Sequence, residues 1–346
     1  MTRIGIIGAG AIGGVVGGML TRAGYDVTLF DHWVEHIDAM KRNGLRLSGP
    51  LIGDIRVPVN AKHLYEAQEI AEPFDLGFVA VKSYDTEWAS AFISPLVKDA
   101  DDGGAIVDFQ NGINDERVAA VVGRERTLGC VITIGAGMYD PGHCMRTDTR
   151  TLGFKIGELD GSDSDRARDI AAMMNHVAGA ESTTNLWGER WGKLAVNCMA
   201  NPVAGLSGYG SGEVRARDDT RWLCIRIAAE VIEVGRAHGH NIEGVWGINS
   251  QKFVDVANGG DPTELDAELI AGAQALGEGR PSFLQDVIRR RRVEIDALNG
   301  WVVEQGKSVE VATPVNQAVA EVVRSFPVGE LRSDPANLAL IMDRLG

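Results

Sequence analysis

A glycine-rich segment near the start of the chain has residue types and a spacing that could bind phosphate groups. It reads GAGAIG over residues 8–13, a G-x-G-x-x-G pattern between two apolar runs. In this pattern the first glycine allows a sharp turn, the second lets a pyrophosphate approach the backbone, and the third lets a helix pack closely. The helix that follows presents N–H groups at its N-terminus, where anions bind. The six residues predicted to hold a dinucleotide are Gly8, Ala9, Gly10, Ala11, Ile12 and Gly13.

An acidic residue follows the glycine segment where a dinucleotide site requires one. Asp31 ends a second apolar run, residues 27–30. A carboxylate at this position accepts hydrogen bonds from the adenosine ribose and repels a 2′-phosphate. The next basic residue is Lys41, so the local sequence offers nothing that would attract that phosphate. We therefore expect NAD to be the preferred cofactor, with NADP as the alternative.

Two further polar residues come directly after apolar runs that indicate buried strands. Lys82 follows residues 74–81 (FDLGFVAV), and Asn111 comes just after residues 105–109 (AIVDF). In open α/β sheets, ligands bind beyond the carboxyl ends of the strands. Both residues are therefore candidates for the dinucleotide site. The alternatives are an ordinary surface lysine and a plain Asn-Gly turn.

A second polar group lies in the C-terminal half of the chain at helical spacing. Lys193, Asn197 and Asn201 are four residues apart within residues 187–208, and in a continuous helix they share one face. Buried amides need hydrogen-bond partners, so this stripe is an unusual choice for a surface that faces a core. A solvated helix face is the alternative, which the apolar neighbours disfavour. Pro202 is expected to end or kink the helix at Asn201.

A third segment combines a serine with a charged helical pattern. Ser282 is expected to cap a helix over residues 283–305. On such a helix Asp286, Arg290 and Glu294 would lie on one face. The arginine cluster at residues 289–292 is expected to form ion pairs with acidic residues of this protein rather than a nucleic-acid site.

The order of the predicted elements changes along the chain. Residues 1–31 indicate a strand, a glycine turn, a helix and a strand, and residues 45–59 indicate a hairpin. Residues 127–157 indicate extended segments, expected to be late, partly antiparallel edge strands. From residue 186 onward, helical periodicity dominates and strand-like runs nearly vanish.

The predicted fold class is therefore α/β with an additional helical part. An N-terminal Rossmann-type dinucleotide-binding domain is expected over residues 1–183, and an all-helical domain over residues 184–346. A chain of 346 residues is long enough for two such domains.

The composition narrows the choice of partners and compartment. The net charge of −14, from 34 basic and 48 acidic residues, disfavours nucleic acid and anionic membranes as partners. No apolar run approaches the ~20 residues of a membrane span, and no signal peptide is evident. Apolar stripes in the helical part are compatible with a homodimer. Reduced thiols in a cytoplasmic protein are expected from four scattered cysteines, Cys130, Cys144, Cys198 and Cys224.

A metal site is not expected. His238 and His240 flank Gly239, but no carboxylate or thiol has the spacing to complete a site with them.

The motifs occur in an order that resembles the ketopantoate reductase (2-dehydropantoate 2-reductase) family. The resemblance covers nearly the whole chain. It implies a Rossmann-type domain joined to an all-helical substrate and catalytic domain, with the active site in the cleft between them. It also implies reversible hydride transfer between a nicotinamide and a small 2-oxo or 2-hydroxy acid, such as ketopantoate and pantoate. The motifs are the glycine segment, Lys82, QNGI at 110–113, K-x-x-x-N-x-x-x-N-P at 193–202, Ser282 with LQD at 284–286, and EID at 294–296.

The resemblance further implies roles for single residues. Lys193 matches the catalytic lysine of the family, and Glu294 matches the carboxylate that assists it. Hydride addition to a ketone leaves an alkoxide, to which an ammonium can supply both a positive charge and a proton. A carboxylate would help a desolvated lysine to stay charged. The residues that match substrate-binding positions are Asn111, Asn197, Asn201 and Ser282, with Asn111 also near the nicotinamide and Lys82 near the cofactor.

The chain departs from the family at Asp31, because the biosynthetic members use NADPH and tend to carry a basic residue there. One alternative is therefore an NAD-dependent catabolic 2- or 3-hydroxy acid dehydrogenase with a different substrate. The QNGI and S-x-L-Q-D segments argue against a 3-hydroxy acid. The other alternative is a non-catalytic dinucleotide-binding sensor, which would have no need to keep Lys193 and Glu294 in matching contexts.

Overall fold

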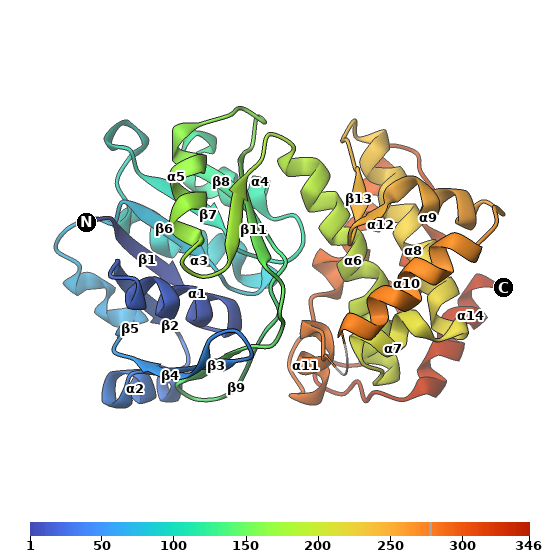
Figure 1. Ribbon diagram of the computed structural model, residues 1–346, viewed down its shortest axis with the longest axis horizontal. Helices are drawn as coiled ribbons and strands as arrows, with labels where there is room; N and C mark the ends of the chain where they lie inside the picture. The colour runs from blue at the N-terminus through green and yellow to red at the C-terminus, as the bar shows by residue number, and fades with distance from the viewer. Residues whose placement is uncertain (277–278) are drawn as a thin grey trace. The chain divides into compact units, whose positions relative to one another are not determined.

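The computed structural model describes residues 1–276 and 279–346 of the chain. These residues form two compact units, Met1–Leu186 and Trp187–Gly346, and each is described by itself. In Figure 1 the N-terminal unit combines strands with helices, whereas the C-terminal unit is almost entirely helical. The predicted fold class, α/β followed by a helical part, is confirmed.

A mostly parallel sheet forms the centre of the N-terminal unit. Its eight strands within the described residues, from one edge to the other, are β12 (Gly179–Ser182), β11 (Leu152–Glu158), β8 (Thr127–Ile132), β7 (Ala105–Asp108), β6 (Leu76–Val79), β1 (Arg3–Ile7), β2 (Asp26–Asp31) and β5 (Asn60–His63). β1 pairs in parallel with β2 on one side and with β6 on the other. The chain therefore changes direction across the sheet at β1, and ligands of open α/β sheets bind at such a switch point.

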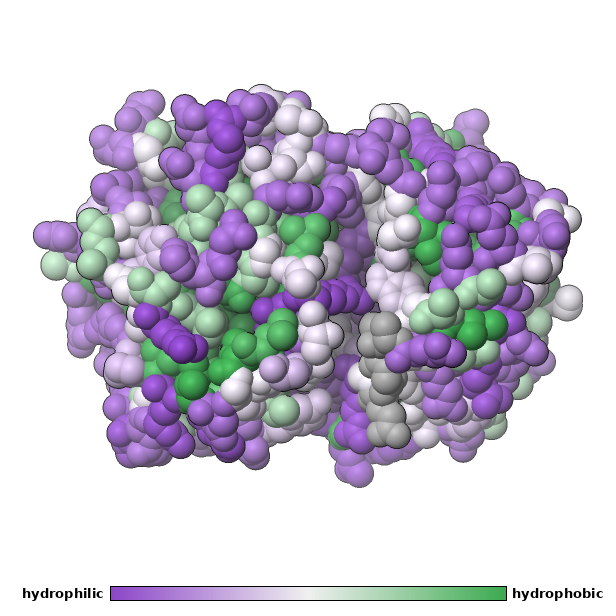
Figure 2. Space-filling view, in the orientation of Figure 1, coloured by the Kyte–Doolittle hydropathy of each residue, from purple (hydrophilic) through white to green (hydrophobic). Residues whose placement is uncertain are grey.

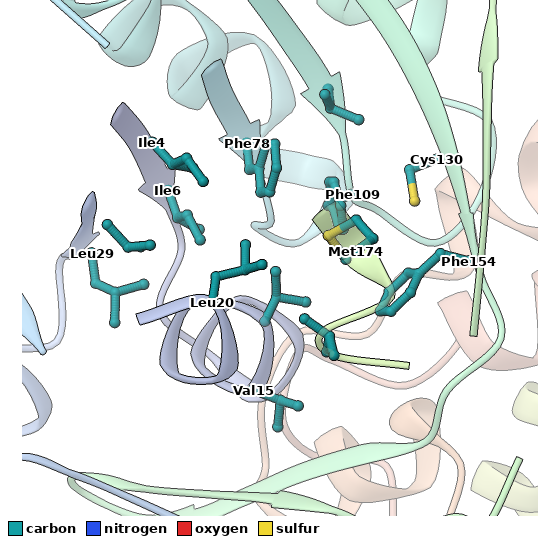
Figure 3. Close-up of a cluster of buried hydrophobic side chains, with 14 of the residues drawn as sticks. Ile4, Ile6, Val15, Leu20, Leu29, Phe78, Phe109, Cys130, Phe154 and Met174 are labelled. Carbon is teal, nitrogen blue, oxygen red and sulfur yellow. The ribbon is translucent and has the colours of Figure 1, made fainter. Parts of the chain in front are cut away.

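Helices cover both faces of this sheet. They are α1 (Ala11–Arg22), α2 (Val34–Asn43), α3 (Thr86–Ile93), α4 (Asp115–Val122) and α5 (Asp165–Met174). Because side chains alternate along a strand, Ile4 and Ile6 join the core that includes α1 and α5, while Ile7 joins the core that includes α3 and α4. Figure 3 shows the first of these cores, with Leu20 of α1 and Met174 of α5 directed toward the strands.

A second, smaller sheet packs on the other side of α1. Its strands are β4 (Gly53–Val57), β3 (Leu45–Gly49), β10 (His143–Arg146) and β9 (Ala136–Asp140), in that order. The predicted hairpin over residues 45–59 is confirmed, since β3 and β4 are antiparallel. A Cβ added to Gly17 would lie 2.5 Å from Leu29 in the main sheet, and one added to Gly18 would lie 2.9 Å from Leu47 in the small sheet. Small residues on two sides of α1 thus let both sheets approach it.

The prediction that residues 127–157 form late, partly antiparallel edge strands is confirmed for the antiparallel pairing and wrong for the edge position of β8. β8 is an interior strand, parallel to β7 and antiparallel to β11. β9 and β10 leave this sheet, and β10 pairs in parallel with β3 of the hairpin. The extended character of the segment was visible in the sequence, but its partners are far away along the chain.

The division between the units lies slightly beyond the predicted boundary at residue 183. The reason is that the chain after β12 stays against the main sheet, where the backbone N–H of Thr183 donates to the carbonyl oxygen of Ile156 in β11 at 2.8 Å. A Cβ added to Gly129 in β8 would lie 2.6 Å from the side chain of Leu186, and one added to Gly157 in β11 would lie 3.1 Å from it. Leu186 therefore packs with the N-terminal unit.

The C-terminal unit consists of helices with one short hairpin. Within the described residues its elements are α6 (Leu186–Ser207), α7 (Ser211–Ala216), α8 (Asp218–Ala237), β13 (Gly244–Val245), β14 (Ile248–Asn249), α9 (Ser250–Ala257), α10 (Thr263–Leu276), α11 (Ser282–Ile288), the 3₁₀ turn η6 (Ile295–Ala297), α12 (Asn299–Ser308), α13 (Pro314–Arg324), the 3₁₀ turn η7 (Pro335–Leu338) and α14 (Ala339–Leu345). In the described part of the chain, no helix combines the length and the apolar character needed to cross a membrane. In Figure 2 the visible face of the C-terminal unit is mostly hydrophilic, whereas that of the N-terminal unit also exposes a hydrophobic patch.

The predicted single helix over residues 283–305 is wrong. The structure divides this segment into α11, η6 and α12, and Arg290 has a φ of 58°, outside the helical range. Asp286 and Glu294 therefore do not share a helix face. Ser282 is the first residue of α11, and the N-cap position that it was expected to occupy is held by Pro281.

Candidate functional site

The glycine segment forms the turn between β1 and α1. Gly8 has a φ of 98°, and a Cβ added there would lie 2.7 Å from the Ala80 carbonyl oxygen. A Cβ on Gly13 would collide with the carbonyl oxygen of Gly8. The predicted sharp turn and close helix packing are therefore confirmed. The Cβ position of Gly10 has no atom within 4 Å, which leaves room beside the backbone where a pyrophosphate is predicted to bind.

The candidate cofactor-binding residues of the N-terminal unit lie at the carboxyl ends of adjacent strands of the main sheet. The carboxyl ends of neighbouring strands are nearly in register, since Ile7, the last residue of β1, lies opposite Phe30, the residue before the end of β2, and opposite Val79, the last residue of β6. Val79 is in turn opposite Asp108 of β7. The glycine loop, Asp31, Lys82 and Asn111 therefore follow adjacent strand ends.

Two side chains connect the loops that carry Lys82 and Asn111. Gln110 donates from Nε2 to the carbonyl oxygen of Val81 at 3.0 Å. Ser83 donates from Oγ to the carbonyl oxygen of Asn111 at 3.1 Å. Gln110 and Ser83 were not predicted as site residues. The signal for them was a polar side chain placed directly after a buried strand.

Asp31 is buried, and its carboxylate shapes the turn that follows β2. Its Oδ1 accepts a hydrogen bond of 2.9 Å from the backbone N–H of Trp33. Lys41 donates to Glu66 at 2.6 Å, and Arg42 lies 4.0 Å from Asp38. The first lysine and the first arginine that follow Asp31 in the sequence are thus each paired with a nearby acid.

The polar stripe of the C-terminal unit lies on one continuous helix. Lys193, Asn197 and Asn201 all belong to α6, at successive turns of the same face. Lys193 is half-buried, and its Nζ donates to Asn197 Oδ1 at 3.0 Å. Asn197 and Asn201 are only 2% and 8% exposed. This burial rules out the alternative of a solvated helix face.

Pro202 was expected to end or kink the helix at Asn201, and the helix end is wrong, since α6 continues and another segment supplies a donor for the carbonyl that proline leaves without one. Proline has no N–H, so the Cys198 carbonyl lacks its usual donor four residues on. Asn299 Nδ2 donates to that carbonyl oxygen at 3.3 Å. Cys224 Sγ lies 2.9 Å from the next carbonyl oxygen, that of Met199. α6 therefore continues to Ser207.

A buried polar network holds Asn299 in place. Asn299 Nδ2 also donates to Asn316 Oδ1 at 2.9 Å, and Asn316 Nδ2 donates to Glu230 Oε2 at 2.7 Å. Glu230 accepts the backbone N–H of Val315 at 2.8 Å, at the start of α13. Burial raises the pKa of Glu230 despite these donors. None of the three polar residues was predicted; a proline inside a helix was the signal that a side-chain donor was needed.

Glu294 and Ser282 lie on segments that pack against α6. Glu294 is 6% exposed and directly precedes η6, shortly before the contact between Asn299 and Cys198. Ser282 is the first residue of α11. The next residue, Phe283, packs against Gly205 of α6, where an added Cβ would lie 2.8 Å from the Phe283 Cε1 atom. The C-terminal candidates are therefore carried by α6 or by segments fastened to it.

The two histidines considered for a metal lie in an aromatic cluster. The His238 and His240 rings lie 6.3 Å apart, and the Trp191 ring is 5.9 Å from that of His238. Burial lowers the pKa of His240. Among the residues that the structure describes, no group of three or more His, Cys, Asp or Glu side chains is placed to hold a metal ion.

The fold and these two groups of side chains define a Rossmann-type oxidoreductase with a helical second unit. Residues 4–161 match the model of "Ketopantoate reductase PanE/ApbA", and residues 185–326 match its C-terminal model. Together the matches cover more than half of the chain. The chain belongs to the ketopantoate reductase family and is an oxidoreductase that acts on a CH–OH group.

Named relatives and solved structures agree with this assignment. A 2-dehydropantoate 2-reductase of Archaeoglobus fulgidus is 30% identical over 94% of this chain and 98% of its own. That of Pyrococcus horikoshii is 31% identical over 91% and 94%. The crystal structure of 2-dehydropantoate 2-reductase from Geobacter metallireducens has 28% identity and a TM-score of 0.77, over 93% of this chain and 99% of that one. D-mandelate dehydrogenase, solved with NADH and anilino(oxo)acetate, shares the fold at 23% identity and a TM-score of 0.78, over 94% and 97%.

Proposed function

We propose that this protein interconverts a small 2-oxo acid and the corresponding 2-hydroxy acid by using a nicotinamide dinucleotide. Ketopantoate and pantoate are the first pair to test, because the curated relatives are 2-dehydropantoate 2-reductases. The observation that carries the proposal is the Lys193 ammonium, held 3.0 Å from Asn197 Oδ1 on a helix face that also contains buried Asn201. This arrangement supplies both a proton donor and amides for a polar substrate.

The N-terminal unit is proposed to bind the dinucleotide. The space beside Gly10 and the start of α1 suit the pyrophosphate, since N–H groups at a helix N-terminus attract anions. Asp31 would accept hydrogen bonds from the adenosine ribose hydroxyls. Lys82 and Asn111, at the ends of β6 and β7, would lie toward the nicotinamide half. When bound, the nicotinamide ring donates or accepts a hydride.

The C-terminal unit is proposed to bind the acid and to move the proton. Hydride addition to the keto carbon leaves a negative charge on oxygen, and the Lys193 ammonium can neutralise this charge and donate the proton. Asn197 orients that ammonium. Asn201 and Ser282 can donate hydrogen bonds to the carboxylate or hydroxyl of the substrate. Glu294 is a buried carboxylate that would favour the charged form of Lys193.

NAD is proposed as the preferred cofactor. A buried carboxylate at Asp31 would repel a 2′-phosphate, and Lys41 and Arg42 are paired with Glu66 and Asp38. The structurally similar D-mandelate dehydrogenase was solved with NADH, so this fold holds NADH in at least one protein. An NAD-dependent enzyme suits oxidation of a 2-hydroxy acid, which is the second function to test.

The test is a comparison of initial rates of ketopantoate reduction with NADH and with NADPH. We expect Lys193→Met to lower kcat roughly 10²–10⁴-fold while NADH binding remains, because the charge and the proton donor are lost. Lys307→Met, on the exposed surface of α12, is the matched control and should behave as the wild type. Full activity of Lys193→Met would disprove the proposed role of this residue.

The outcome also separates the alternatives. NADH binding without turnover of ketopantoate would direct the search to other 2-oxo and 2-hydroxy acids. NADH binding without turnover of any of them would favour the dinucleotide-binding sensor. Location in the cytoplasm and a homodimer remain proposals. Fractionation of cells and sedimentation of the purified protein test them.

A further inference from the structure

His36 connects three segments of the N-terminal unit that are far apart in the sequence. It lies on α2 and is fully buried. Its Nε2 atom is 2.9 Å from the carbonyl oxygen of Ala9, inside the glycine loop. Its Nδ1 atom accepts the backbone N–H of Gly142 at 2.8 Å, in the turn between β9 and β10. One imidazole ring therefore joins α2, the glycine loop and the small sheet.

The partners of the ring determine its protonation. A backbone N–H can only donate, so Nδ1 must be an unprotonated acceptor toward Gly142. A carbonyl oxygen can only accept, so Nε2 must carry the proton and donate it to Ala9. These two contacts select the neutral Nε2–H tautomer of His36. Burial favours the same state, because it lowers the pKa of His36.

The carbonyl groups of the glycine loop need hydrogen-bond donors from the rest of the protein, because they point away from the phosphate that the loop is proposed to bind. A loop that binds phosphate must direct N–H groups at the ligand, which leaves carbonyl oxygens directed into the protein. A buried carbonyl without a partner is costly. His36 donates to the carbonyl oxygen of Ala9, whereas the carbonyl oxygen of Gly10 accepts the backbone N–H of Gly14 at 2.7 Å, with the Cys144 Sγ atom 3.5 Å away. Burial raises the pKa of Cys144 to about 12, so the thiol keeps its proton.

The His36 ring also contacts the turn that follows β2. The Trp33 ring stacks on His36 with centroids 5.5 Å apart and an interplanar angle of 17°. The backbone N–H of Trp33 is held by Asp31, the proposed ribose-binding residue. The turn that carries Asp31 and the glycine loop are therefore both in contact with His36.

We propose that His36 is a positioning residue for the cofactor, which fastens the carbonyl of Ala9 to the small sheet and so holds the glycine loop in its phosphate-binding shape. This inference rests on the proposed binding of a dinucleotide by that loop. It assigns a function to the small sheet, whose β9–β10 turn provides the Gly142 anchor. His36 acts through the loop and need not touch the cofactor.

Two substitutions at His36 separate its role as a donor to the Ala9 carbonyl from its role as an acceptor of the Gly142 N–H. The amide of His36→Gln can reach the position of Nε2 and donate to Ala9, whereas the shorter amide of His36→Asn reaches only the position of Nδ1. We expect His36→Asn to weaken NADH binding about 10-fold and to raise the KM for NADH alike, with kcat and the KM for ketopantoate nearly unchanged. His36→Gln should recover most of the affinity. His63→Gln, at a buried histidine of β5 that is 3.0 Å from Asp38, is the matched control and should bind NADH normally.

A measurement on the wild-type protein covers the case in which the variants do not fold. Long-range ¹H–¹⁵N correlation spectra should show His36 as the neutral Nε2–H tautomer at pH 7.5, with an Nε2 signal that shifts when NADH is added. An Nδ1–H tautomer, or a signal unmoved by saturating NADH, would overturn the proposal. So would equal NADH affinity of wild type, His36→Asn and His36→Gln. Absence of any binding of NADH and NADPH by the wild type would instead refute the proposed function together with this inference.

Discussion

Asp31 is the residue on which the choice between the two dinucleotides depends. It is buried at the end of β2. This strand pairs with β1, which leads into the glycine loop, and we therefore place the adenosine ribose of a bound dinucleotide next to Asp31. A negative charge at this point has two opposite effects, because it holds ribose hydroxyl groups and repels a 2′-phosphate. Each effect can be measured separately.

We predict that Asp31→Ser raises the KM for NADH and lowers the KM for NADPH. The ratio of the two kcat/KM values should change at least about tenfold, since a charged hydrogen bond is lost while a repulsion is removed. Asp169→Ser, on the exposed side of α5, is the control and should leave the ratio as in the wild type. A ratio unaffected by Asp31→Ser would mean that another residue selects the cofactor.

At the scale of elements, α6 is the helix that needs the most support from its neighbours. It carries Lys193, Asn197 and Asn201, yet Pro202 removes one of its internal hydrogen bonds. The replacement donor is Asn299, which immediately follows the segment containing Glu294. The hydrogen bond that repairs the helix therefore also fixes the start of α12 to it.

We predict that Asn299 and Pro202 are energetically coupled. Asn299→Ala should lower the free energy of unfolding by about 1–3 kcal/mol, because it leaves a buried carbonyl without a donor. In a Pro202→Ala background the backbone N–H returns, so the same substitution should cost about 1 kcal/mol less. Urea unfolding followed by circular dichroism measures this cycle, with Glu304→Ala as the exposed control on α12. Strict additivity of the two changes would contradict the assigned role of Asn299.

At the scale of the whole molecule, buried titratable groups make stability depend on pH. Burial lowers the pKa of His36, His143 and His240. The unfolded chain then binds more protons than the folded chain just below the ordinary histidine pKa of about 6.5, so stability falls as the pH falls through that range. Burial of Glu230 acts in the opposite sense, because its raised pKa makes stability fall as the pH rises through the folded value.

We predict that the urea midpoint of unfolding is higher at pH 7.5 than at pH 5.5, because three histidines oppose one carboxyl group. His36→Gln should flatten this dependence, since it removes one of the buried histidines. Glu230→Gln should make the dependence steeper. A midpoint that is lower at pH 7.5, or that responds to neither substitution, would show that other groups govern the pH dependence.

The sequence by itself determined the features that depend on neighbouring residues. The spacing of Gly8, Gly10 and Gly13 indicates the turn and the close helix, because backbone conformation and the absence of a Cβ are local properties. The change from strand-like to helical periodicity indicates two units, because periodicity is also a property of neighbouring residues. The order of the motifs, including the lysine and asparagine stripe, was enough to identify the family.

Only the tertiary structure decided the features that depend on distant partners. The pairing of β10 with β3, the contact of His36 with Gly142 and the repair of α6 by Asn299 join segments separated by about 100 residues. Local periodicity carries no record of such pairs, since a strand or a proline looks the same whatever satisfies it. For this reason Pro202 was expected to end or kink a helix that in fact continues to Ser207, and residues 283–305 were expected to form one helix where the chain turns.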